Sequence, residues 1–140
     1  MPTLRILGVY EDGSPRADGV PPSARQSLAI TQGAQTVLEL TVVTPAGVAL
    51  DLTAQTSLVL TFAIRRTYIG MSRTPDLQLT GALVPAAGTN RADFTITSDN
   101  TSTLIPGRYS YDLWLSSTEL GRQPLVPTSP LRLEPAVLLP

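Results

Sequence analysis

The sequence predicts an all-β domain in which two sheets pack face to face. Short segments of alternating apolar and polar residues recur along the chain, and turn-forming residues separate them. Pro (13) and Gly (10) are spread throughout, and no stretch keeps a helical period. With 42% hydrophobic residues in a chain of 140, there is enough apolar material for one core without disulfides. A barrel is the alternative all-β architecture, whereas a helical fold is excluded.

Six segments follow the period of two that is typical of a strand with one buried face. In chain order they are residues 35–43, 58–65, 77–80, 92–97, 108–116 and 131–133. In the first of them, Leu38 and Leu40 alternate with Glu39, and in the fifth the inward set is Tyr109, Tyr111, Leu113 and Leu115. Strands this short, each apolar on one face, favour a sandwich.

The turn-forming residues fall between these segments. Residues 44–47, 85–90 and 117–121 each carry Gly, often with Pro, in the order that a tight turn requires. The polar residues 98–103 are expected to form a loop or one helical turn. Residues 127–130 contain two prolines and are expected to leave the sheet before the last strand.

The fifth strand begins with a more specific pattern. Residues 104–111 read Leu-Ile-Pro-Gly-Arg-Tyr-Ser-Tyr, so the strand is entered through Pro106-Gly107. This resembles the tyrosine corner of immunoglobulin-like sandwiches, in which a Tyr hydroxyl bonds back to the loop before its strand. Either Tyr109 or Tyr111 plays that part, and the alternative is that both are simply core aromatics. The fold predicted is therefore an immunoglobulin-like antiparallel β-sandwich.

The two ends differ from the middle. Residues 1–27 are predicted to be an extended N-terminal arm, with an apolar tip at Leu4, Ile6, Val9 and Tyr10 before a stretch rich in Pro and Gly. The alternative is an ordinary first strand followed by a long loop. Residues 28–140 form the sandwich and end in a short apolar tail, whose Val137, Leu138 and Leu139 are expected to dock on a neighbouring subunit.

The composition argues against an enzyme. The chain has no His and no Cys, so the usual Ser and Cys triads and zinc sites cannot be assembled. A carboxylate pair for glycoside hydrolysis remains, but the acidic residues occupy outward strand positions or turns. Examples are Glu39, Asp93 and Asp112 on strands and Asp12, Asp18 and Asp51 in turns. We therefore expect no catalytic residues and no cofactor.

The sequence also gives no reason to expect a metal site, a nucleic-acid partner or a membrane-spanning segment. Glu11, Asp12 and Asp18 lie close together but lack the alternation of a calcium loop. The net charge is −1 and no basic patch interleaves with aromatics, so nucleic acid is not an expected partner. No segment approaches about 20 consecutive apolar residues, and the first ten residues do not form a signal peptide. We expect a soluble chain made in the cytoplasm.

Trp114 is unusual for its strand position. By alternation it points to the face opposite Tyr109 and Leu113, which in a sandwich is the outer face. There it would serve as an aromatic anchor for a partner subunit or for a sugar ring. The alternative is that a loop or the terminal arm covers it. Arg108 and Asp112 share this face and are expected to form a polar pair.

The order of motifs carries a resemblance to a known family. The quoted segments are Gln32-Gly33-Ala34, Leu50-Asp51-Leu52-Thr53, Arg65-Arg66, the run from Leu104 to Leu115, Gly121-Arg122 and Ser129-Pro130-Leu131-Arg132-Leu133. Over about residues 30–137 they resemble the immunoglobulin-like N-terminal domain of bacteriophage upper baseplate proteins and related small virion proteins. Those relatives usually continue into a coiled coil or a receptor-binding module. The resemblance implies a structural subunit of a baseplate, tail or neck, or a capsid decoration protein.

Two functional hypotheses follow, with an enzyme as a weak third. The first is a virion structural protein that binds other virion proteins and copies of itself, as a homo-oligomer in the particle. It expects termini that become ordered on assembly. The second is a carbohydrate- or receptor-binding module with Trp114 and the Tyr residues as a stacking platform. A fully buried Trp114 would exclude the second hypothesis.

Overall fold

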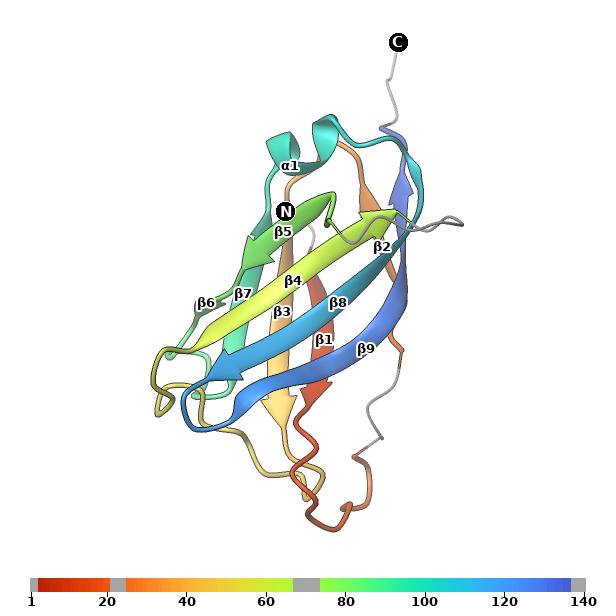
Figure 1. Ribbon diagram of the computed structural model, residues 1–140. Coiled ribbons are helices and arrows are strands. Elements are labelled where there is room, and N and C mark those ends of the chain that lie inside the picture. Colours follow the sequence, from red (N-terminus) through yellow and green to blue (C-terminus); the bar gives the residue numbers. More distant parts are fainter. Residues whose placement is uncertain (1–2, 21–24, 67–73, 137–140) are drawn as a thin grey trace.

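The computed structural model describes residues 3–20, 25–66 and 74–136. Two sheets pack on each other, as the sequence predicts (Figure 1). One has the strand order β1-β3-β7-β6 and the other β2-β9-β8-β4-β5. The strands are β1 (Thr3–Val9), β2 (Leu28–Thr31), β3 (Thr36–Val43), β4 (Val59–Arg66), β5 (Leu77–Thr80), β6 (Ala82–Leu83), β7 (Arg91–Ile96), β8 (Gly107–Ser117) and β9 (Gly121–Glu134).

These strand orders match the immunoglobulin-like arrangement. In that fold one sheet has the order ABED, and the other places C, F and G side by side with C′ at an edge. Here β3, β4, β7, β8 and β9 take the positions of B, C, E, F and G. The first strand is divided between the sheets, because β1 lies beside β3 and β2 lies beside β9.

The core lies between the sheets and is built from the alternating positions. The central ones, Leu38, Leu40, Phe62, Phe94, Tyr111 and Leu113, are all 0% exposed. The rings of Phe62 and Tyr111 stand 5.3 Å apart, and those of Phe62 and Phe94 5.8 Å apart, both in tilted arrangements. Such ring pairs stabilise a core beyond their buried area.

The N-terminal segment corrects the predicted arm. Residues 3–9 form strand β1 within the sandwich, which is the alternative of an ordinary first strand followed by a long loop. Strand β1 belongs to one sheet and β2 to the other (Figure 1), and the described residues between them, 10–20 and 25–27, form neither helix nor strand. Gly8 allows close packing here, since a Cβ at this position would stand 3.1 Å from both Leu40 and Leu125.

The sheets are not purely antiparallel, which is a second correction. Strand β1 runs parallel to β3, and β2 runs parallel to β9, while the remaining pairs are antiparallel. Parallel neighbours need a long connection, and the segments between the paired strands provide it. Both parallel pairs stand at the edges of their sheets.

The last strand is longer than expected. Residues 127–130, predicted to leave the sheet, lie within β9, which pairs with β8 throughout except for register shifts near Tyr111 and Leu113. Pairing of β9 with β2 begins only at Leu131. Pro124, Pro127 and Pro130 all come before Leu131. In that part of β9 only β8 is paired with it, so a proline that lacks an N–H on the other side costs little.

The polar segment at residues 98–103 forms the single helical turn that was one of its two expected structures. Helix α1 (Ser98–Ser102) starts at a capping box, in which the Thr97 hydroxyl accepts from the Asn100 N–H and the Asn100 side chain accepts from the Thr97 N–H. In the part of the chain that the structure describes, no helix is long and apolar enough to cross a membrane.

Candidate interaction surfaces

The predicted N-terminal interface residues pack into this domain's own core. Ile6 and Val9 are 3% and 2% exposed, which makes them unavailable to another subunit. Leu4 and Tyr10 are partly buried against the same core, and the Tyr10 N–H donates to Val43 O at 2.9 Å. The predicted C-terminal interface residues Val137, Leu138 and Leu139 lie outside the described residues.

Trp114 lies on the outer face of the five-stranded sheet and is half-buried. It lines a hollow of about 360 Å³ together with Thr61, Gln78 and Asp112. The Arg122 guanidinium from strand β9 stands 4.8 Å from the centroid of its ring. This cation–π contact holds the ring in place and leaves part of it accessible.

Asp112 pairs with a different arginine from the one expected. Its Oδ2 accepts from Arg65 Nη1 at 2.6 Å, and its Oδ1 accepts from the Thr128 hydroxyl at 2.5 Å. Arg65 stands on the neighbouring strand β4 opposite Ser110, which makes it the diagonal neighbour of Asp112, whereas Arg108 is four residues away along β8. Diagonal neighbours on adjacent strands stand roughly 7–8 Å apart and positions four apart in one strand roughly 13 Å, so Arg65 and not Arg108 forms the pair.

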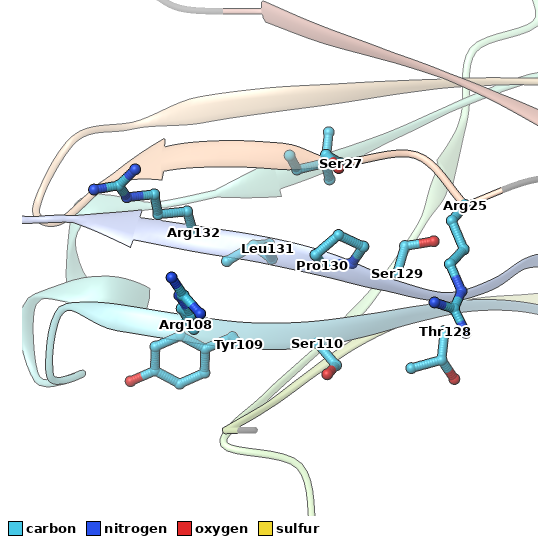
Figure 2. A pocket seen from close by; sticks show the side chains of 11 residues that line it. Arg25, Ser27, Arg108, Tyr109, Ser110, Thr128, Ser129, Pro130, Leu131 and Arg132 are labelled. Carbon is cyan, nitrogen blue, oxygen red and sulfur yellow. The ribbon is translucent and has the colours of Figure 1, made fainter. Parts of the chain in front are cut away.

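A second hollow on the same sheet is bordered by arginines. It has a volume of about 580 Å³ and lies along β2, β9 and β8. We call it the arginine groove, after Arg25, Arg108 and Arg132, all of which are exposed. Figure 2 shows Arg108 and Arg132 near one end and Arg25 beside Thr128 at the other. None of the three lies within ion-pair distance of a carboxylate in residues 3–20, 25–66 or 74–136.

The outer face of the other sheet has balanced charges. The Glu39 Oε2 on β3 forms ion pairs with Arg5 Nε of β1, at 3.6 Å, and with Arg91 Nη2 of β7, at 3.1 Å. Arg91 also stands 3.8 Å from Asp93. Two arginines and two carboxylates thus neutralise one another across three strands. The unpaired positive charge of the described residues is concentrated on the five-stranded sheet.

Turn carboxylates have local roles. Asp12 accepts from the N–H and hydroxyl of Ser14, and these hydrogen bonds hold the pKa of Asp12 below its ordinary value. Hydrogen bonds from Thr53 lower the pKa of Asp51 in the same way. Glu119 accepts from the Thr56 N–H at 2.8 Å, which lowers its pKa as well. Among the described residues, no three carboxylates gather in a way that could hold a metal ion.

The arginine groove was not predicted from the sequence. The alternation of side chains along a strand already places Arg108 and Arg132 on outer faces, so the sequence indicated that both arginines are exposed. Their proximity depends on the β8–β9 register, and the position of Arg25 depends on the division of the first strand. Neither property follows from the order of residues alone.

Fold and surfaces together define an immunoglobulin-like sandwich with a positively charged outer sheet face. No family model matches the chain, and no curated protein matches it. Among solved structures, it is similar to the N-terminal domain of phage TP901-1 ORF48, with 9% identity, a TM-score of 0.44, and coverage of 96% of this chain and 99% of that one. It is also similar to a multicopper oxidase, with 13% identity, a TM-score of 0.34, and coverage of 94% and 44%. Likenesses this distant carry no argument about function.

Proposed function

We propose that this chain is a structural protein of a bacteriophage virion, and that it binds neighbouring subunits through the outer face of its five-stranded sheet. One observation carries the binding surface: this face exposes Arg25, Arg108 and Arg132 without carboxylate partners among the described residues. Arginine and tryptophan are the residues most enriched where interfaces gain their energy, and the same face carries Trp114.

The virion setting rests on the sequence resemblance. The run from Leu104 to Leu115 carries it best, together with the order of the motifs around that run. We infer that the partners are other virion proteins and further copies of this chain, in a baseplate, tail, neck or capsid decoration. The inference that the chain is not an enzyme rests on the absence of His and Cys from its sequence.

The test of the virion role is quantitative mass spectrometry of density-purified particles of the phage that encodes the chain. We expect its peptides at a fixed ratio to those of the major capsid protein, in every preparation. A fixed ratio is the mark of a built-in component, because a contaminant varies between preparations. Absence of the chain from particles, while it is abundant in the infected lysate, would overturn the proposal.

A carbohydrate-binding role is the second candidate, and Trp114 supports it. Its half-exposed ring stands in a hollow with the polar side chains of Thr61, Gln78 and Asp112, a combination suited to a sugar ring. Arg122 over the ring opposes this role, because the guanidinium occupies a stacking position. Glycan-array binding that Trp114→Ala abolishes and Val48→Ala retains would favour it, since Val48 is an exposed apolar residue away from this face. An array without any bound glycan would contradict it.

A further inference from the structure

Two like charges face each other on the outer sheet surface. Arg108 of β8 and Arg132 of β9 are directly opposite in the strand register, and both are exposed. Like charges in this relation destabilise a sheet. No carboxylate of the described residues lies within ion-pair distance of either side chain. The pair is thus an electrostatic cost to the free domain, and an anion placed between the two guanidinium groups would remove that cost.

A third arginine stands further along the same groove. Strand β2 is parallel to β9, and Leu28 is paired with Leu131. Three residues before each of these, the same register places Arg25 beside Thr128. The Gln26 N–H, which donates to the Ser129 hydroxyl at 3.2 Å, agrees with this alignment. Arg25 is therefore displaced from Arg132 by four residues of an extended strand, roughly 13 Å.

The surface between the arginines suits an extended chain. Pro130 and Ser110 line the middle of the groove, between the Arg108–Arg132 pair and Arg25 (Figure 2). In an extended segment, residues i and i+4 point to the same side and stand about 13 Å apart. Two acidic side chains at this spacing would meet the two positively charged ends of the groove together.

We propose that the arginine groove binds an extended acidic segment of a neighbouring protein, with carboxylates at positions i and i+4. One carboxylate contacts the Arg108–Arg132 pair and the other contacts Arg25. Arginine suits this partner because its guanidinium forms paired hydrogen bonds to a carboxylate. The proposal rests on the proposed function, since it gives the chemistry of the subunit that the outer face holds.

The probe is a synthetic decapeptide of Ser, Thr and Val with Glu at positions 3 and 7. The control peptide has the same composition with Glu at positions 3 and 4, where the two carboxylates point to opposite sides of an extended chain. Isothermal titration with the intact chain is carried out in about 50 mM and about 500 mM NaCl, since salt screens such contacts. We expect the spaced peptide to bind about tenfold more tightly than the control, and its binding to weaken strongly at high salt.

Protein variants locate the contact. We expect the double variant Arg108→Gln/Arg132→Gln to lose at least about tenfold in affinity for the spaced peptide. Arg5→Gln is the matched control, because the Arg5 side chain is 88% exposed on the outer face of the opposite sheet. We expect this variant to bind the spaced peptide with the same affinity as the unaltered chain. Circular dichroism of both variants checks that the fold is kept.

Three results would overturn the proposal. They are equal binding of the two peptides, unchanged affinity of the double variant, and tighter binding of a heparin oligosaccharide than of the spaced peptide. The last would identify the groove as a sulfated-polysaccharide site. Failure here is distinguishable from failure of the virion role. If the chain is a fixed component of particles and no acidic peptide binds, the virion role stands and only the assigned partner chemistry falls.

Discussion

Two tyrosines of strand β8 hold separate loops through their hydroxyl groups. The Tyr109 hydroxyl donates to the Ile105 carbonyl at 2.6 Å, four residues upstream, which is the bond of a tyrosine corner. The Tyr111 hydroxyl donates instead to the Gln26 carbonyl, far away in the chain. Tyr109 therefore forms the corner, and Tyr111 fastens the segment that leads into β2.

Tyr109→Phe tests the corner bond. The variant keeps the ring in the core and removes the hydrogen bond to Ile105. We expect the free energy of unfolding to fall by about 1 kcal/mol, measured by urea denaturation at pH 7. Ser116→Ala, at an exposed position of the same strand, should change it by less than about 0.5 kcal/mol. A Tyr109→Phe variant as stable as the unaltered chain would contradict a structural role for this bond.

Tyr111 makes stability depend on alkaline pH. Burial raises the pKa of Tyr111 from 10.0 to about 12. The unfolded chain loses this proton near pH 10 while the folded chain keeps it, so stability is intact below pH 10 and falls as pH rises from 10 to 12. The loss is at most about 2.7 kcal/mol. Urea denaturation at pH 9, 10.5 and 11.5 should show a shallower fall for Tyr111→Phe, and equal slopes would be inconsistent with this pKa.

The strands differ in how far their sequences predict them. Strands β3, β7 and β8 alternate cleanly, because each has one face in the core and the other outward, and β4 alternates except at Ala63, which is buried as well; all four were predicted. Strand β1 lacks clean alternation, with Leu7 and Gly8 between Ile6 and Val9, and was interpreted as part of an arm. A strand at the edge of a sheet can be too short or too irregular to show alternation, so β2 was not predicted and β1 was predicted only as the alternative to an arm.

Gln26 connects the two halves of the first strand in a way that only the structure shows. Its side-chain amide donates to Leu7 O at 2.7 Å, and its side-chain oxygen accepts from the Leu7 N–H at 3.1 Å. The side chain thus supplies β1 with both bonds that a neighbouring strand would make at this point. The backbone carbonyl of Gln26 also accepts a hydrogen bond from the Tyr111 hydroxyl.

Gln26→Ala should loosen β1. It leaves the N–H and carbonyl of Leu7 without these partners, so we expect a loss of about 1–3 kcal/mol in the free energy of unfolding. Hydrogen exchange should quicken in residues 3–9 more than in β8. Gln123→Ala, which removes a glutamine of β9 at a similar half-buried level, is the control. Unchanged exchange in β1 would show that Gln26 does not hold that strand.

The two sheets carry charge differently: the outer face of one is neutralised by ion pairs, and on the other Arg25, Arg108 and Arg132 have no carboxylate partner among residues 3–20, 25–66 and 74–136. The net charge of −1 gives no sign of this. The sequence predicted the outward Trp114, but not the groove, because Arg25, Arg108 and Arg132 come together through strand register. The predicted pair of Arg108 with Asp112 was wrong for the same reason, since Arg65 stands closer across the sheet.

If the arginine groove binds a partner, its facing arginines should lower the free energy of unfolding of the unbound domain. We expect Arg108→Gln/Arg132→Gln to raise the free energy of unfolding by about 0.2–1 kcal/mol, because it removes two like charges that face each other. Urea denaturation in low salt measures the gain, which should shrink as salt screens the repulsion. A destabilised double variant would mean that the arginines stabilise this domain by themselves.

A density map of the assembled particle, at a resolution that separates strands, tests the proposed subunit role. The proposal predicts that the outer face of the five-stranded sheet, with Arg108, Arg132 and Trp114, lies against another protein subunit. It also predicts an acidic segment along the arginine groove. A particle in which this sandwich is present with that face open to solvent would contradict the account.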